Sequence, residues 1–296
     1  MNDSGNTSKV LVAGPTGFLG SAICGHLAAK NKQVKGLVRA SSDAGKVAQL
    51  KESGVETVSG DLKNADSLKN ALKGVSAVIS TVNSAMSRQE GDTIQTVDEE
   101  GQINLINAAV DAGVSQFIYI SLCPMPVEFP LQTAKRKVEK RLRESGLNYT
   151  ILQPTYFMEV WLSPALGFDF PNAKANIYGE GKSKISWISI KDVASFAVAA
   201  LDNPAAKNKV IELGGPEALS LLDAVNIFES THDKKFELQF VPEEAIAAQK
   251  KEAPDPLSES FAGLTLGVVK GSEIDMNNTL NDFPVDLTSV KDYAKN

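Results

Sequence analysis

Three evenly spaced glycines near the start of the chain mark the first place where chemistry could occur. They lie in Gly14-Pro15-Thr16-Gly17-Phe18-Leu19-Gly20, directly after the short apolar run 9–13. A tight turn of this kind lets backbone N–H groups and the positive end of a following helix approach the phosphates of a dinucleotide. The spacing G-x-x-G-x-x-G differs from the commonest fingerprint, so the prediction depends on the strand before it and the helix after it. The alternative is a glycine-rich turn that binds nothing.

Two charged residues follow the next apolar runs and bear on the choice of cofactor. Arg39 stands just past the run 33–38. In sites for NAD an acidic residue at this place binds the ribose hydroxyls, whereas an arginine accommodates the 2′-phosphate of NADP. We therefore predict NADP(H), with an ordinary surface arginine as the alternative. Asp61 and Leu62 follow the run 55–59, and Asp61 either contacts the adenine or caps the next helix.

Lys135 is the main candidate for a catalytic side chain. At about 100° per residue, a helix over 131–145 places Lys135 on the same narrow face as Leu131, Val138 and Leu142. Burial and the first turn of a helix both disfavour a cation, so we expect a compensating role in donating a proton or binding ribose. The alternative is a lysine whose stem packs while its ammonium reaches water.

These residues need a parallel sheet to bring them together. Strand-like runs alternate with helical patterns, which predicts an α/β fold with a doubly wound parallel Rossmann sheet. Ligands bind at the carboxyl edge of such sheets, where Thr81, Asn83 and Ser121 follow their strands. The polar stretch 84–98 is either a mobile loop or the fraying start of a helix.

A second group of candidates follows the sixth strand, 149–152. Pro154, Thr155 and Tyr156 cross the carboxyl edge where a nicotinamide is expected, and Tyr156 is a second candidate proton donor. Phe157, Met158 and Trp161 are predicted to line a substrate pocket, although such a cluster is more often part of a core.

The alternation of strands and helices lapses after this point, which predicts a smaller α/β substrate lobe. We expect a disordered leader over 1–8, a nucleotide-binding domain over 9–155 and a lobe over 156–296. A helix over 191–202 and a strand over 209–213 are expected to return to the first sheet. Short strands are also predicted at 185–188 and at 236–241.

Composition limits the classes of function. The chain has 296 residues, a net charge of −6 and 43% hydrophobic residues, which suits a cytoplasmic globular protein and argues against a nucleic-acid partner. No run is long and apolar enough to suggest a membrane span. Two histidines and two cysteines make a metal site improbable.

Several of these motifs in combination resemble the NmrA-like group of atypical short-chain dehydrogenases. They are Gly14–Gly20, Arg39, Gly60-Asp61-Leu62, the inward Lys135, Ser145–Pro154 and Trp187–Ala194. The resemblance implies that the glycines bind pyrophosphate, Arg39 the 2′-phosphate and Asp61 the adenine side, and that Lys135 matches the active-site lysine of isoflavone-reductase-like members. The tyrosine usual four residues before the lysine in the wider superfamily is replaced by Leu131.

The sequence therefore supports two functions. The first is an NADPH-dependent oxidoreductase that reduces a small carbonyl, enone or quinone-like substrate by hydride transfer. The second is a non-catalytic NADP(H)-binding redox sensor that acts through a protein partner, since the resembling family contains such members.

Overall fold

The computed structural model describes residues 9–85 and 89–295, so the predicted leader over 1–8 lies outside the described residues. The chain divides into two compact units. The first contains residues 1–121, 134–152 and 194–210, and the second contains residues 122–133, 153–193 and 211–296.

A seven-stranded sheet with the order β3-β2-β1-β4-β5-β6-β9 organises the first unit. The neighbouring pairs from β3 to β6 are parallel, as the alternating pattern predicts. The strands are β1 (Lys9–Ala13), β2 (Val34–Val38), β3 (Glu56–Ser59), β4 (Val75–Ser80), β5 (Gln116–Ile120), β6 (Asn148–Pro154) and β9 (Lys209–Leu213).

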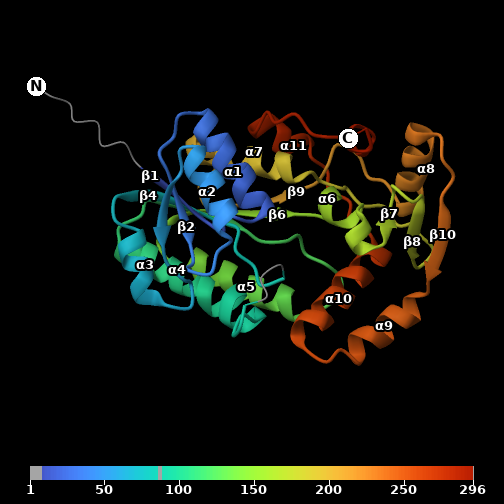
Figure 1. The fold of residues 1–296 in the computed structure, drawn as a ribbon, viewed down its shortest axis with the longest axis horizontal. Helices are drawn as coiled ribbons and strands as arrows, with labels where there is room; N and C mark the ends of the chain where they lie inside the picture. The colour runs from blue at the N-terminus through green and yellow to red at the C-terminus, as the bar shows by residue number, and fades with distance from the viewer. Residues whose placement is uncertain (1–8, 86–88, 296) are drawn as a thin grey trace, which may run out of the picture. The chain divides into compact units, whose positions relative to one another are not determined.

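Helices cover both faces of this sheet, with α3, α4 and α5 on one side and α1 and α7 on the other (Figure 1). Leu11 and Ala13 of β1 pack into the core on the side of α3 to α5, because alternate residues of a strand point to opposite faces. The helices are α1 (Phe18–Ala29), α2 (Ala44–Glu52), α3 (Ala65–Ala71), a π-helix (Ile94–Glu99), α4 (Glu100–Asp111), α5 (Pro130–Arg143), α7 (Ile190–Asp202) and a 3₁₀ turn (Pro204–Ala206).

The second unit is built on a three-stranded sheet of order β10-β8-β7, in which β10 pairs parallel and β7 antiparallel to β8. Phe228 packs among Phe168, Phe170 and Phe236 in its aromatic core. Its elements are α6 (Met158–Trp161), a 3₁₀ turn (Pro164–Leu166), β7 (Phe168–Asp169), β8 (Lys174–Tyr178), α8 (Leu221–His232), β10 (Glu237–Val241), α9 (Glu243–Lys251), α10 (Pro256–Lys270), α11 (Asn277–Asp282) and α12 (Val290–Tyr293).

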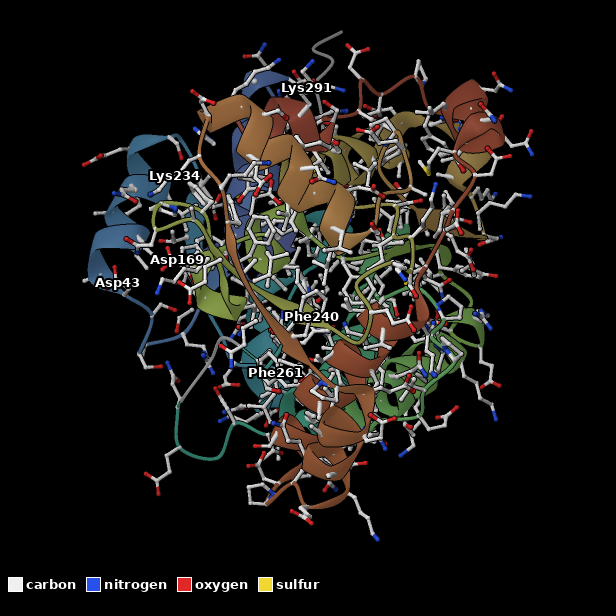
Figure 2. The ribbon with its side chains drawn as sticks, turned by 90° about the vertical axis from the view of Figure 1, so that its right-hand side faces the viewer. Asp43, Asp169, Lys234, Phe240, Phe261 and Lys291 are labelled. Carbon is white, nitrogen blue, oxygen red and sulfur yellow. The ribbon has the colours of Figure 1, made fainter. Side chains whose placement is uncertain are left out.

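One feature of the second unit differs from the sequence-based expectations. The strand predicted at 185–188 is wrong: Ile185 pairs with Leu219 and with Ser272, and Ile188 pairs with Phe157, as isolated bridges to three different segments. The aromatic side chains of Phe240 on β10 and Phe261 on α10 are exposed (Figure 2).

Within the described residues, no helix combines the length and the apolar character needed to cross a bilayer.

Gly20 and Gly25 provide a test of how α1 packs against the preceding turn. A Cβ on Gly20 would lie 2.0 Å from the carbonyl oxygen of Gly14, whereas a Cβ on Gly25 would meet nothing within 4 Å. We expect Gly20→Ala to lower the free energy of unfolding by about 1–3 kcal/mol, as overpacking does. The matched Gly25→Ala should raise it by about 0.5–1 kcal/mol. Urea unfolding of both variants measures this, and equal effects would contradict the predicted close approach.

Candidate functional site

The glycine turn of the first unit leaves the start of α1 open to a ligand. Gly14 has φ +84°, a conformation that favours glycine. Its carbonyl accepts a hydrogen bond from the amide of Gly17, which is the N-cap of α1. This N-cap forms no side-chain hydrogen bond, and the first turn contains no acidic residue. The first N–H groups of α1 and its positive end are therefore suited to bind phosphate.

Several other helices begin with a capping side chain, whereas the N-caps of α4 and α9, like that of α1, form no side-chain hydrogen bond. Asp43 caps α2, Asn64 caps α3 and Asp255 caps α10, in each case by accepting a backbone N–H. The alternative role of Asp61 as a helix cap is therefore wrong, because Asn64 has that role. Phe18, the first residue of α1, is 66% exposed beside this open end.

Arg39 belongs to a charged cluster at the ends of β2 and β3. Its Nη1 donates to Asp92 Oδ2 at 2.7 Å, and Lys63 Nζ donates to Asp92 Oδ1 at 2.6 Å. The side chain of Asp92 is 0% exposed, and those of Arg39 and Lys63 are each 27% exposed. Two cations thus share one buried carboxylate, and we call this group the Asp92 clasp.

Further hydrogen bonds tie the clasp to the turns that follow β2 and β3. Ser41 Oγ donates to Gln89 Oε1 at 2.6 Å, and Gln89 Nε2 donates back to the Ser41 carbonyl at 3.3 Å. The Lys63 amide donates to Asp61 Oδ1 at 2.9 Å. Asp61 and Arg39 therefore lie on turns that both connect to the clasp.

The remaining predicted residues of the first unit have defined contacts. Thr81 Oγ1 donates to the Ala13 carbonyl at 3.1 Å, directly before the glycine turn. Asn83 Oδ1 accepts the Ala85 amide at 3.1 Å. Leu62 is buried in the core beside α3 and α4, so its side chain packs and only its backbone is available to a ligand.

Lys135 points inward, as the helical pattern predicts. It is 7% exposed, and the exposed fractions of Leu131, Val138 and Leu142 on the same face are 7%, 0% and 0%. Its Nζ donates to the Ile120 carbonyl at 3.2 Å, at the carboxyl end of β5. Burial lowers the pKa of Lys135, while the carboxylates of Asp98 and Glu139 act in the opposite direction.

Asp98 and Tyr119 complete a buried group around the Lys135 ammonium. Lys135 Nζ lies 5.2 Å from the centroid of the Tyr119 ring. Asp98 Oδ2 accepts the Ser84 amide at 3.0 Å and the Ser84 hydroxyl at 2.5 Å. Among the described residues, Asp98 Oδ1 and the Tyr119 hydroxyl are the buried side-chain atoms without a hydrogen-bond partner. Burial raises the pKa of Asp98 against the effect of Lys135, so the group can hold a proton inside the protein.

Ser121 contacts the same helix as Lys135 through a different residue. Its Oγ donates to Glu139 Oε1 at 2.5 Å, and Glu139 also forms ion pairs with Arg136 and Arg143. Ser121 is 5% exposed. The hydroxyl therefore orients the buried Glu139 carboxylate in this conformation.

The predicted residues 154–156 belong mostly to the hydrogen-bond network of the second unit. Pro154 ends β6, and Thr155 Oγ1 donates to the Ser186 carbonyl at 2.5 Å. Tyr156 is 2% exposed and its hydroxyl donates to the Leu264 carbonyl at 3.0 Å. Burial raises the pKa of Tyr156 well above its ordinary range, so this phenol holds its proton tightly.

The predicted pocket residues lie in or beside the core of the second unit. Met158 is 0% exposed and Trp161 9% exposed, and Phe157 is half-buried. The Trp161 ring packs edge-on against Tyr156, with 5.0 Å between centroids. Their role in a substrate pocket stays a prediction, and the burial of Met158 favours a packing role for that residue.

Some residues of these groups were not recognised from the sequence. Lys63 and Asp92 belong to the clasp, the charge of Asp98 acts on the pKa of Lys135, and Lys46 Nζ lies 5.9 Å from the centroid of the Phe18 ring. Lys63 could have been recognised from the sequence, because it directly follows the motif Gly60-Asp61-Leu62. Asp92 and Asp98 fall in the stretch 84–98, whose polar composition has no period from which an inward side chain could be inferred.

Comparisons with known proteins identify the family of the chain. A model of the NmrA-like family matches residues 6–291. The chain is 32% identical over 297 residues to an isoflavone reductase homolog of Zea mays, which covers 90% of each chain. It is 33% identical over 214 residues to an NAD(P)H azoreductase of Xenophilus azovorans, which covers 71% of this chain and 69% of that one.

A solved structure extends the comparison to the fold. An NADPH-dependent quinone oxidoreductase of Escherichia coli, complexed with NADPH, is 25% identical with a TM-score of 0.78 and covers 96% of this chain and 98% of that chain. The resemblance to the NmrA-like family and the predicted α/β class are thereby confirmed.

The Asp92 clasp leads to a prediction about stability. We expect Asp92→Asn to lower the free energy of unfolding by about 1.5–3 kcal/mol, because Arg39 and Lys63 lose the negative charge of their shared partner and one of its two acceptor oxygens. Asp66→Asn is the matched control: Asp66 pairs with Lys69, but its side chain is 88% exposed, so no measurable change is expected. Urea unfolding measures both, and an unchanged Asp92→Asn protein would contradict the clasp.

Proposed function

Because the chain belongs to the NmrA-like family, we propose that the protein is an NADPH-dependent reductase that acts on a small carbonyl, enone or quinone-like substrate. The observation that carries the proposal is the start of α1, where a glycine turn leads into a helix end without a capping side chain. The azoreductase and the quinone oxidoreductase among the similar proteins support the reaction class.

The residues of the first unit fit a dinucleotide. A Cβ on Gly14 would lie 2.8 Å from Thr81 Oγ1 and one on Gly20 2.0 Å from the Gly14 carbonyl, so the turn is compact enough to give a phosphate access to backbone N–H groups. Arg39 carries the charge that a 2′-phosphate requires, and Asp92 orients its guanidinium.

Lys135 is the proposed proton source. When bound, NADPH would supply a hydride to the substrate carbon, and a residue of this chain would have to supply one proton to the reduced oxygen. The lowered pKa of Lys135 makes its ammonium a stronger acid than that of an exposed lysine, while the Asp98 carboxylate favours the protonated form. Tyr156 is the second candidate, although its hydroxyl donates to the Leu264 carbonyl.

The cofactor preference is tested at Arg39. We expect NADPH to bind more tightly than NADH, and Arg39→Ala to weaken NADPH binding by about 1.5–3 kcal/mol, or at least roughly tenfold, without changing the affinity for NADH. Calorimetric titration of both cofactors measures this. Equal affinities in the unchanged protein, or equal losses for both cofactors in the variant, would show that Arg39 does not bind the 2′-phosphate.

The catalytic role is tested at Lys135. We expect Lys135→Met to keep the fold and most cofactor affinity but to lower turnover by roughly 100- to 10,000-fold, the contribution of general acid catalysis. The turnover of the unchanged enzyme should fall as the pH rises through the lowered pKa of Lys135, because the acid form of the lysine is then lost. This decrease with pH should be absent in the variant.

Lys140→Met is the matched control, since Lys140 is an exposed residue of the same helix, and its turnover should be unchanged. A loss of NADPH affinity rather than turnover in Lys135→Met would assign the lysine to ribose binding. No NADPH oxidation with a panel of quinones, enones and aldehydes would contradict the reductase and favour the redox-sensor alternative.

A further inference from the structure

Two buried polar atoms of the first unit have no hydrogen-bond partner among the described residues: Asp98 Oδ1 and the hydroxyl of Tyr119. The exposed fractions of these two residues are 1% and 0%. A buried polar group without a partner destabilises the folded protein, because it loses its hydrogen bonds to water and gains none in return. Neither atom has a role in the proposed reduction, so each needs a partner from another source.

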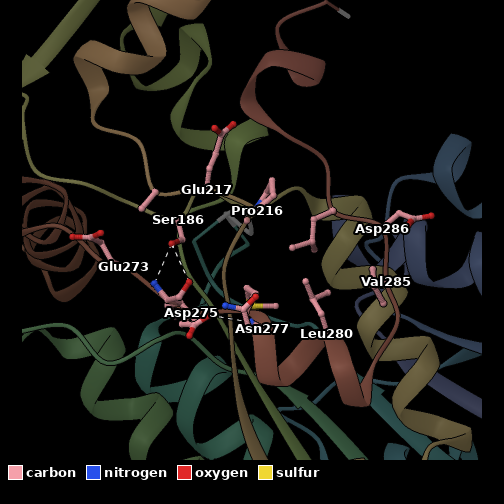
Figure 3. Close-up of a pocket in the computed structure, with 14 residues that line it drawn as sticks. Ser186, Pro216, Glu217, Glu273, Asp275, Asn277, Leu280, Val285 and Asp286 are labelled. Carbon is pink, nitrogen blue, oxygen red and sulfur yellow. Dashed lines mark hydrogen bonds between the residues drawn. The ribbon is translucent and has the colours of Figure 1, made fainter.

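Other buried hydroxyl groups of the chain have protein partners. Ser186 lines a cavity of about 640 Å³ in the second unit, where its Oγ donates to the Ile274 carbonyl at 3.4 Å and accepts the Ile274 amide at 3.0 Å (Figure 3). In the first unit, Thr150 is 0% exposed and its Oγ1 donates to the Ala206 carbonyl at 2.9 Å. The two unpartnered atoms are therefore exceptions within the described part of the chain.

The Lys135 ammonium adds unused donors to the same region. An ammonium group has three N–H donors, and within the described residues Lys135 Nζ forms one hydrogen bond, to the Ile120 carbonyl at 3.2 Å. The Nζ atom also lies 5.2 Å from the centroid of the Tyr119 ring. Because Lys135 is only 7% exposed, bulk solvent contributes little to its hydrogen bonding. Two of its donors therefore remain for another partner.

The charge of Asp98 acts on both other groups. After burial, it is the next cause of the lowered pKa of Lys135 and of the raised pKa of Tyr119. No direct hydrogen bond joins Asp98 to Lys135, since Oδ1 has no partner and Oδ2 accepts the amide and the hydroxyl of Ser84. Polar groups that interact across more than hydrogen-bond distance are commonly bridged by water.

The remaining charges around these groups are already paired. Glu139 and Arg136 of α5 are the other charges that act on Lys135, and they form an ion pair with each other. Asp92 is the other charge that acts on Asp98, and it is held within the Asp92 clasp. Asp98 is thus the carboxylate with an unpartnered oxygen in the surroundings of Lys135.

The backbone around Asp98 also differs from that of an ordinary helix. Asp98 lies in the π-helix Ile94–Glu99, a rare form that often occurs at functional sites. Gln102, one turn further along, is also buried, but it accepts the Ser80 hydroxyl at 2.8 Å and donates to the Val82 carbonyl at 2.9 Å. Both side chains contact the end of β4 or the segment after it, yet only Asp98 keeps an unpartnered oxygen among the described residues.

We propose that one internal water molecule binds between these groups, accepting hydrogen bonds from the Lys135 ammonium and the Tyr119 hydroxyl and donating one to Asp98 Oδ1. A buried water commonly forms about three hydrogen bonds, which matches the two donors and one acceptor that need a partner here. Asp98 and Tyr119 are then positioning residues that orient the ammonium group. This role in the reaction rests on the proposed function of Lys135, whereas the water site itself does not.

Urea unfolding of Tyr119→Phe distinguishes a bridged hydroxyl from an unpartnered one in the full-length, cofactor-free protein. Loss of a hydroxyl that binds the water should lower the unfolding midpoint, because the water then lacks one of its partners. The matched variant Thr150→Val, which removes a buried hydroxyl with a known partner, should lower it as well. A midpoint that stays the same or rises in Tyr119→Phe would show that the hydroxyl has no partner to lose, and would overturn the proposal.

Titration of Lys135 tests its link to Asp98. NMR spectra of the cofactor-free protein with ¹³C-labelled lysine give the pKa of Lys135, and the signal is assigned by its loss in Lys135→Met. Asp98→Asn should lower this pKa by about one unit or more, since a nearby negative charge favours the ammonium form. Thr150→Val should leave it unchanged. An unchanged pKa of Lys135 in folded Asp98→Asn protein would remove Asp98 from the arrangement and contradict the proposal.

A high-resolution crystal structure of the cofactor-free protein locates the water directly. We expect it within hydrogen-bond distance of Lys135 Nζ, the Tyr119 hydroxyl and Asp98 Oδ1. A direct ion pair between Lys135 and Asp98, or no water between the three groups, would overturn the proposal. None of these measurements uses cofactor or substrate. An absence of reductase activity would therefore contradict the proposed function and leave the water site standing.

Discussion

The contact between Gly20 and the Gly14 carbonyl is the constraint on which the dinucleotide-binding arrangement depends. It requires a residue without Cβ at the third position of α1, since a Cβ would lie 2.0 Å from that oxygen. The contact holds the start of α1 close to the carboxyl end of β1. The neighbouring parallel strands end at the same edge of the sheet. No capping side chain competes for the first N–H groups of the helix. A compact turn and an open helix end therefore follow from the same glycines.

Buried charge determines how the neighbouring residues are held. The side chain of Asp92 is fully buried and is stabilised by Arg39 and Lys63, so these two cations have a fixed arrangement in the folded protein. Lys135 is in the opposite situation, because a buried ammonium loses hydration and its nearest carboxylates only partly compensate. Such an arrangement costs stability, which is typical of a group kept for its chemistry rather than for the fold.

The sequence was most informative where local patterns determine the structure. The strands of the seven-stranded sheet and the inward face of Lys135 followed from apolar runs and from helical spacing. The failures have a common cause, since they concern residues whose partners lie far away along the chain. The segment 185–188 pairs with three separate segments, and Asp92 contacts two turns more than twenty residues before it. Neither arrangement produces a periodic pattern of apolar and polar residues in the sequence.

The most direct test of the account is a crystal structure of the protein with bound NADP⁺. The account predicts that the pyrophosphate accepts hydrogen bonds from backbone N–H groups of Phe18 and Leu19 at the start of α1, where charge and geometry both favour an anion. It also predicts the 2′-phosphate at the Arg39 guanidinium, with Asp92 still bound to Lys63. A pyrophosphate bound away from α1, or a 2′-phosphate that contacts only solvent, would contradict the central claim.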